Sequence, residues 1–332
     1  MQKIEQGMTK EEIFGFLKEQ YCVTDKKAQI AYEIACREKA LLDQLDCKNG
    51  YSLYAGIPFC PSICSYCSFS SSPIAEWKDQ VDRYLDAMIK ELKATAKLMQ
   101  GKTLDTVYIG GGTPTTLEAD QLDRLLGTIR ENFDLEHVLE FTVEVGRKHT
   151  VEDVEQIFHL ARELGFDNIN MDLIAGLPGE DAADMQDTLE KIEKLHPDSL
   201  TVHALAIKRA AKFGQEGRTM DPGSEITQMV EAAAASAERM GLVPYYLYRQ
   251  KNIAGNFENV GYAEQDKAGV YNILIMEERQ TIIACGAGST TKLVLPEKIK
   301  TSSGKETNLI RVENVKNITE YIGRIDEMIE RK

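Results

Sequence analysis

The sequence predicts an α/β fold in which parallel β-strands alternate with α-helices, and three observations support it. Short apolar runs alternate with amphipathic stretches from Tyr51 onward, as in repeated βαβ units. Cysteines, glycines and carboxylates follow several of these runs, where the active site of a parallel barrel or sheet gathers. The length of 332 residues exceeds a typical single domain but suits one barrel-like domain with appendages.

The N-terminal segment, residues 1–48, is expected to be a helical lead-in, because its apolar residues recur at helical spacing. The barrel-like part is expected to cover residues 49–210. Its expected strands are Ser52–Ile57, Thr106–Gly110, Leu139–Val143, Asn168–Leu173 and Ser199–Leu205. Helices are expected at 79–100, 118–131, 151–164 and 181–194, with Gly165 as the C-cap of the third.

The remaining part, residues 211–332, is expected to be a small α+β extension, because the regular alternation loosens after Leu205. An Ala-rich helix is expected near 225–240, and an amphipathic helix over 318–329 is expected to close the chain. The expected strands and loop of this part are Tyr245–Arg249, Tyr271–Met276 and Thr281–Cys285, with a polar loop over Pro296–Glu306.

Charge and cysteine content exclude several classes of protein. The net charge of −14 argues against a nucleic-acid partner, because the chain has no basic stripe that could neutralise phosphates. No N-terminal run resembles a signal peptide, and no stretch approaches the roughly 18 apolar residues of a membrane span. Seven cysteines, three of them in one short segment, suit a reducing compartment. We therefore expect a cytoplasmic protein without a membrane span.

The most informative segment contains Cys60, Cys64 and Cys67. This spacing lets one tight loop present three thiolates to a soft inorganic centre and leave a fourth coordination position open. A structural zinc site would need a fourth cysteine or histidine from elsewhere in the chain, and none is paired with this loop. A zinc site and a redox disulfide remain alternatives to the favoured reading, which is a four-iron four-sulfur cluster with one open iron.

Three further segments lie at the ends of expected strands or within one. Residues 110–115, Gly-Gly-Gly-Thr-Pro-Thr, form either a plain tight connection or a turn whose N–H groups approach a ligand. Glu144 follows the third strand and is either a solvated strand end or a ligand contact. Asp172 lies inside an otherwise apolar strand, where a buried carboxylate is costly unless it is paired or hydrogen-bonded. It is either a structural residue or part of a site.

The cysteine loop, with Tyr66 just before its third cysteine, resembles that of the radical S-adenosylmethionine (SAM) enzymes. Three ordered segments resemble one branch, the anaerobic coproporphyrinogen III dehydrogenases and the related heme chaperones: Ile-Pro-Phe-Cys at 57–60, the glycine motif at 110–115, and Asp-Leu-Ile-Ala-Gly-Leu-Pro-Gly at 172–179. Segments 200–209 and 245–252 are similar to the HemZ-type dehydrogenases of anaerobic Gram-positive bacteria. The resemblance covers about residues 50–332.

This resemblance implies a four-iron four-sulfur cluster on the three cysteines, with SAM bound to its open iron. It also implies oxidative decarboxylation of coproporphyrinogen III to protoporphyrinogen IX in heme biosynthesis, supported by an unidentified electron donor. A heme-binding chaperone and an inactive paralogue remain alternatives. The residues carried over are Tyr54 as an active-site and cofactor residue, Tyr66 against adenine, and Gly111, Gly112, Thr113, Glu144, Arg147 and Asp172 as SAM contacts. Candidate clamps for the substrate propionates are Lys208, Arg209, Arg249 and Lys251.

Two departures from the family pattern stand out. Phe69 occupies the position of a further cysteine found in the well-characterised dehydrogenases. More seriously, the family has a whole αβ unit between the residue that matches Glu144 and the Arg-x-His-Thr segment, which lies at 147–150 here, and this chain lacks that unit. The sequence then offers five barrel strands where the family has six, so we expect an incomplete parallel barrel that exposes strand edges.

Overall fold

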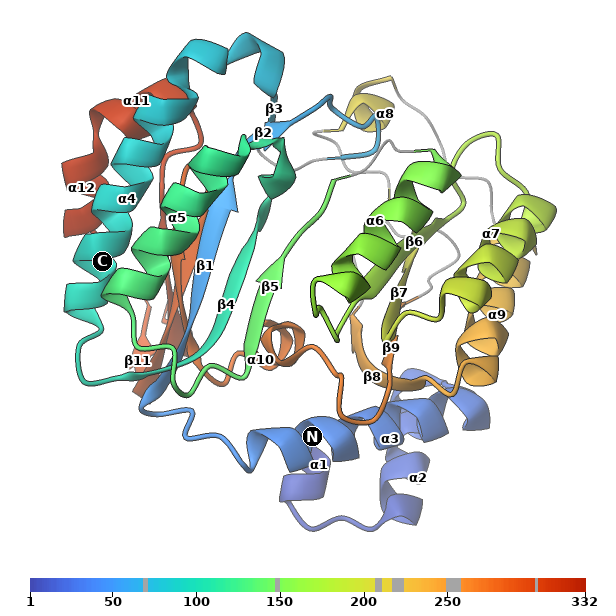
Figure 1. Ribbon diagram of the computed structural model, residues 1–332. Helices are drawn as coiled ribbons and strands as arrows, with labels where there is room; N and C mark the ends of the chain where they lie inside the picture. The colour runs from blue at the N-terminus through green and yellow to red at the C-terminus, as the bar shows by residue number, and fades with distance from the viewer. Residues whose placement is uncertain (68–70, 147–149, 207–210, 217–223, 249–257, 302–303) are drawn as a thin grey trace. The chain divides into compact units, whose positions relative to one another are not determined.

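A computed structural model describes residues 1–67, 71–146, 150–206, 211–216, 224–248, 258–301 and 304–332 (Figure 1). The chain divides into two compact units, each made of two separate stretches of sequence. Unit 1 comprises Met1–Gln44 and His149–Gly269, and unit 2 comprises Leu45–Lys148 and Val270–Lys332. The three-part division expected from the sequence, with limits near residues 49 and 211, stays a prediction.

Unit 2 is built on a six-stranded sheet in the order β12-β11-β10-β1-β4-β5. The strands β10, β1, β4 and β5 are parallel, and the hairpin of β11 and β12 adds two antiparallel strands at one edge. The strand bounds are β1 Gly50–Ile57, β4 Thr103–Gly111, β5 Glu140–Val143, β10 Thr281–Cys285, β11 Thr290–Lys300 and β12 Glu306–Glu313. Its helices are α4 Val81–Leu98, α5 Ala119–Asn132, α10 Val270–Glu277, α11 Ile318–Gly323 and α12 Ile325–Glu330.

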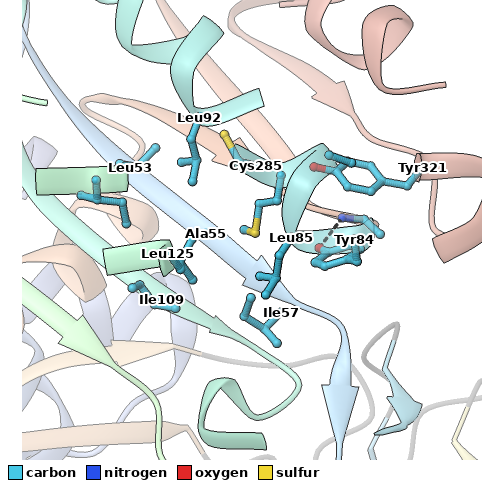
Figure 2. Packing of buried hydrophobic residues seen from close by; sticks show 14 of the residues in the cluster. Leu53, Ala55, Ile57, Tyr84, Leu85, Leu92, Ile109, Leu125, Cys285 and Tyr321 are labelled. Atoms are coloured by element: carbon cyan, nitrogen blue, oxygen red, sulfur yellow. Dashed lines mark hydrogen bonds between the residues drawn. The ribbon is translucent and has the colours of Figure 1, made fainter. Parts of the chain in front are cut away.

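The core of unit 2 lies between this sheet and α4 (Figure 2). Alternate residues of β1, namely Leu53, Ala55 and Ile57, are fully buried, because successive side chains of a strand point to opposite faces. Leu85 and Leu92 come from one face of α4 and are also fully buried. This packing fixes the strand from which the cysteine loop begins.

Unit 1 contains a four-stranded sheet in the order β6-β7-β9-β8, in which β6 and β7 are parallel and the other pairs are antiparallel. Helices α7 and α9 pack on each other, and their apolar side chains share a core with β6 and β7. Its strands are β6 Asn170–Ala175, β7 Ser199–Ala204, β8 Val243–Tyr248 and β9 Asn259–Ala263. Its helices are α1 Gln2–Glu5, α2 Lys10–Tyr21, α3 Asp25–Leu42, α6 Val151–Glu163, α7 Ala182–Leu195, α8 Lys212–Gln215 and α9 Ser224–Arg239.

Most predicted elements are confirmed within two or three residues at each end, including the helical lead-in and all five barrel strands. Gly165 does follow α6 with a positive φ of 89°, and the Phe166 N–H bonds back to the Ala161 carbonyl at 3.0 Å. The predicted α/β class with parallel strands is therefore correct. In the described part of the chain the strands form two larger open sheets and a third, two-stranded sheet.

Three predictions in the C-terminal part are wrong. Segment 271–276 forms helix α10, because a short apolar run has no periodicity that separates a helix from a strand. The predicted polar loop 296–306 belongs mostly to the arms of the β11–β12 hairpin, whose exposed strands carry polar side chains. The predicted closing helix is interrupted at Arg324 and forms the two short helices α11 and α12. Strands β9, β11 and β12 of this part were not predicted.

The two described strands that flank the predicted gap, β5 and β6, are edge strands of their sheets. Among the described strands, β5 pairs only with β4, and β6 pairs only with β7. Leu139 and Phe141, at and beside β5, are exposed apolar residues, and α6 exposes Ile157 and Leu160. Each unit therefore presents apolar side chains that a neighbouring element would normally cover. Within the described residues, no helix has the length and apolar character needed to cross a membrane.

A buried carboxylate links helix α4 with the segment after β10 and with the C-terminal part of unit 2. Glu91 of α4 is fully buried, and its carboxylate accepts hydrogen bonds from Tyr321 Oη at 2.5 Å and from the Gly286 N–H at 2.8 Å. The Asn314 side-chain amide and the Lys332 ammonium each donate to it at 2.7 Å. These donors compensate a charge that would be unfavourable without partners in the core.

We predict that Glu91→Ala lowers the free energy of unfolding of unit 2 by about 3–5 kcal/mol, because it leaves the Lys332 ammonium and several donors buried without an acceptor. Trp77, the only tryptophan of the chain, packs against this core, so its fluorescence during urea unfolding measures the effect. Lys90→Ala is the matched control on the same helix, because Lys90 pairs with Asp326 in solvent. Equal urea midpoints for Glu91→Ala and the control would contradict the prediction.

Candidate functional site

The cysteine loop is anchored at both sides by backbone pairing. After β1 ends at Ile57, the short strand β2 (Phe59–Cys60) pairs with β3 (Ser72–Pro73), and the Ser72 N–H donates to the Pro58 carbonyl at 2.8 Å. Inside the loop, the Cys67 N–H donates to the Cys64 carbonyl at 3.0 Å. Cys60, Cys64 and Cys67 are all half-buried. The loop therefore starts at the carboxyl end of a core strand, as the sequence predicts.

The three thiols do not converge on the position of one metal ion. Across the described residues, no group of three or more His, Cys, Asp or Glu side chains is arranged to hold a single ion. A four-iron cluster requires a different arrangement, because each thiolate binds its own iron atom. Two hydroxyls suit such a sulfur-rich, negatively charged group. Thr113 Oγ1 donates to Cys60 Sγ at 3.7 Å, and the buried Ser62 Oγ has no partner in the described part of the chain. The residues present therefore fit a cluster.

The other cysteines have different surroundings. All seven are free thiols, and Cys22, Cys36 and Cys47 lie outside the loop. Burial raises the pKa of Cys285 to about 11, so this thiol stays protonated near neutral pH. Cys285 is therefore a core residue, which contacts Thr95 at 3.4 Å.

The glycine motif packs directly against the cysteine loop. The Gly112 N–H donates to the Ile57 carbonyl and the Thr113 N–H donates to the Phe59 carbonyl, each at 2.7 Å. A Cβ atom on Gly112 would lie 2.4 Å from the Phe59 carbonyl oxygen and 3.0 Å from Cys60 Sγ. Gly111 has a φ of +110°, which favours glycine. The motif is thus fitted to the loop by its own backbone contacts.

Three tyrosine rings stack on the same face of the sheet as Glu144. Tyr108 of β4 stacks on Tyr271 of α10 with ring centroids 4.4 Å apart, and on Tyr54 of β1 at 6.1 Å. Tyr108 Oη donates to Glu144 Oε1 at 2.6 Å. Burial raises the pKa of the Tyr54 and Tyr271 phenols, with the Glu144 carboxylate as a further cause in both, so both stay protonated.

Sequence reasoning identified Tyr54 and Glu144 but missed Tyr108 and Tyr271. The alternation of β4 could have indicated Tyr108, because it lies two residues before the glycine motif and therefore on the same face as Gly110. Nothing in the sequence pointed to Tyr271, because its segment was assigned to the wrong kind of element.

Asp172 lies in unit 1, on β6, and the expectation that it is buried is wrong. Its side chain is 41% exposed. Asn170 Nδ2 donates to its Oδ1 at 2.7 Å, and His203 Nε2 lies 3.8 Å from its Oδ2. The apolar neighbours Met171 and Leu173 point to the opposite face of the strand, which explains why an apolar sequence context did not mean burial.

Within unit 2 the structure brings together most of the predicted site: Tyr54, Cys60, Gly111, Gly112, Thr113 and Glu144. Tyr66 is half-buried in the cysteine loop. The predicted SAM contact Arg147 lies outside the described residues, as do all four candidate propionate clamps, Lys208, Arg209, Arg249 and Lys251.

Comparison with known proteins identifies the family of this site. The model of the radical SAM superfamily matches residues 115–192. The oxygen-independent coproporphyrinogen-III oxidase-like protein HemZ of Bacillus subtilis is 36% identical over 361 residues, which cover 96% of this chain and 71% of HemZ. The heme chaperone HemW of B. subtilis is 30% identical, over 58% of this chain and 62% of HemW. The oxygen-independent coproporphyrinogen III oxidase of Escherichia coli is 32% identical, over 46% of this chain and 41% of that protein.

A solved structure agrees in fold. The coproporphyrinogen III oxidase HemN of E. coli, described as a radical SAM enzyme, superposes with a TM-score of 0.64 at 20% identity. The match covers 88% of this chain and 73% of HemN.

The HemZ alignment also bears on the αβ unit that the sequence analysis expects to be missing. At 361 residues it is longer than the 332-residue chain, so it includes positions that only HemZ occupies. The family assignment rests on the identity and coverage of HemZ, together with the superfamily match and the HemN fold. The chain belongs to the radical SAM superfamily, in the family of oxygen-independent coproporphyrinogen III oxidase-like proteins, which implies a four-iron four-sulfur cluster and SAM as its cofactors.

Proposed function

We propose that this protein is a cytoplasmic radical SAM oxidoreductase that converts coproporphyrinogen III to protoporphyrinogen IX in heme biosynthesis. The observation that carries the proposal is the hydrogen-bonded junction of the cysteine loop with the glycine turn, beside the face that holds Tyr54 and Glu144. Such a junction would keep a cluster and its bound cofactor in one orientation. The 36% identity to HemZ supports a reaction of the heme pathway.

Each group of residues has a proposed role. Cys60, Cys64 and Cys67 would hold the cluster, with Thr113 donating to the first thiolate. The backbone at Gly111–Gly112, the carboxylates of Glu144 and Asp172, and the Arg147 side chain would bind SAM, while Tyr54 and Tyr66 would pack against it. With the cluster and SAM bound, the site would have the radical chemistry needed to remove a propionate β-hydrogen. Lys208, Arg209, Arg249 and Lys251 would bind the propionates.

A heme chaperone is the second candidate function. The 30% identity to HemW favours it, and so does Phe69 at the position of a further cysteine. A chaperone must keep heme bound, whereas the enzyme must release its product. The two functions therefore differ in a measurable way.

The deciding experiment is anaerobic incubation of the reconstituted protein with SAM, a reductant and coproporphyrinogen III. We expect protoporphyrinogen IX, CO2 and 5′-deoxyadenosine, and we expect Arg249→Ala to slow their formation without loss of iron. Stoichiometric heme binding without decarboxylation, in protein that holds its cluster and SAM, would transfer the assignment to the chaperone.

We predict that anaerobically reconstituted protein carries four irons per chain and that Cys64→Ala loses most of them, because each cluster thiolate binds one iron. Iron and acid-labile sulfide analysis measures this, and Cys22→Ala is the control because Cys22 is an exposed cysteine outside the loop. Full iron content in Cys64→Ala, or stoichiometric zinc in the parent protein, would refute the cluster assignment.

We predict that Asp172→Ala weakens SAM binding about ten- to a hundredfold. An exposed carboxylate can accept hydrogen bonds from the ribose hydroxyls, and a hydrogen bond to a charged group contributes roughly 1.5–3 kcal/mol. Calorimetry on the reconstituted protein measures the affinity. Asp187→Ala, on the exposed side of α7, is the control and should bind SAM like the parent. Equal affinities of the two variants would remove Asp172 from the site.

A further inference from the structure

We propose that Tyr108 is a positioning residue, which holds the Glu144 carboxylate in the orientation that SAM requires; this rests on the proposed SAM-binding role of Glu144. Tyr108 Oη donates to Glu144 Oε1 at 2.6 Å. A hydrogen bond to an ionised acceptor is shorter and stronger than one between neutral groups. It therefore restrains a glutamate side chain, which would otherwise rotate about three bonds.

The Tyr108 phenol is itself held in a fixed direction. Its ring lies against Tyr271 with centroids 4.4 Å apart and planes inclined by 23°, and Tyr54 stacks on it from β1 at 6.1 Å and 16°. Tyr271 is buried, and its backbone N–H donates to Glu140 Oε2 at 3.0 Å. Tyr54 and Tyr271 also stack on each other, with centroids 6.4 Å apart, so the three rings form one cluster. Tyr108 cannot swing away from Glu144 without losing its contacts with both other rings.

The sheet places Tyr108 and Glu144 on one face. Tyr108 is the register partner of Thr142, two residues before Glu144, so alternation directs both side chains to the same side. The Glu144 N–H donates to the Ile109 carbonyl at 2.9 Å, which continues the pairing beyond the end of β5. The pair therefore comes from the backbone geometry of β4 and β5.

Gly110 makes room for this pair. A Cβ atom at this position would lie 2.8 Å from Tyr108 Cε1 and 2.9 Å from Glu144 Cδ. Thus the first glycine of the motif is explained by the Tyr108–Glu144 contact, whereas Gly112 is explained by the cysteine loop. Tyr54, Tyr108 and Glu144 are half-buried, so a ligand can still reach this face.

The first test is Tyr108→Phe, which keeps the stacked ring and removes the hydroxyl. We expect the Kd of the reconstituted protein for SAM to rise about tenfold at unchanged iron content. The KM for SAM in 5′-deoxyadenosine formation should rise by a similar factor, with a smaller change in kcat. Tyr51→Phe is the control, because Tyr51 is a buried tyrosine on the opposite face of β1. Unchanged SAM affinity in Tyr108→Phe would overturn the inference.

A double-mutant cycle separates positioning from a general structural effect. If Tyr108 acts through Glu144, Tyr108→Phe should weaken SAM binding in the parent protein but have little further effect in Glu144→Ala. Additive losses would overturn the inference. Gly110→Ala provides a second route, because its methyl group would displace the same pair, and its effect should also vanish in Glu144→Ala.

The outcome also separates this inference from the proposed function. If Glu144→Ala binds SAM like the parent protein, both the SAM-binding role of Glu144 and the positioning role of Tyr108 are wrong. If the cycle is non-additive but coproporphyrinogen III is not decarboxylated, the inference stands and only the substrate assignment fails.

Discussion

The parallel pairing of β1 with β4 is the constraint on which the candidate site depends. Its register places Gly56 opposite Gly110 and Ile57 opposite Gly111, so both strands end at the same level. The cysteine loop and the glycine turn therefore leave the sheet side by side, and their backbones bond to each other within three residues of the strand ends. A shift of this register by one residue would turn the side chains of β1 to the wrong face and separate the loop from the turn.

A second interaction holds the same strand end from the other side. Tyr84 Oη donates to the Gly56 carbonyl at 2.6 Å and accepts from the Ala287 N–H at 3.0 Å. The neighbouring Gly286 N–H is bound by the buried Glu91 carboxylate at 2.8 Å. The Glu91 carboxylate and the end of β1 are therefore linked through the adjacent Gly286 and Ala287 amides and the Tyr84 hydroxyl. Removal of one partner from such a network is strongly destabilising. The network therefore also restrains the geometry of the cysteine loop.

Patterns of local origin could be predicted from the sequence, whereas properties that depend on distant partners could not. The amphipathic helices are local patterns, and their prediction was confirmed. The cysteine spacing is local as well, and its role as a cluster motif stays a prediction. The exposure of Asp172 depends on which face of β6 is covered, and that is decided by α7 and α9. Likewise, the helical state of α10 depends on burial of Tyr271 and Leu274, which a short apolar run does not encode.

Strand β5 has two unequal faces. Glu140, Thr142 and Glu144 alternate with the exposed Leu139 and Phe141, which is the pattern of a strand whose second face is covered by a helix. Since both apolar side chains are only partly exposed, each forgoes part of the roughly 1.5–3 kcal/mol that full burial contributes.

This loss stays local because each unit has its own core. Leu53, Leu92 and Ile109 of unit 2 are fully buried, and so is Leu189 of unit 1. Glu144 keeps its bond to Tyr108 from β4, so its position does not depend on a strand beyond β5. The contacts that hold the cysteine loop, the glycine turn and Glu144 thus lie within unit 2.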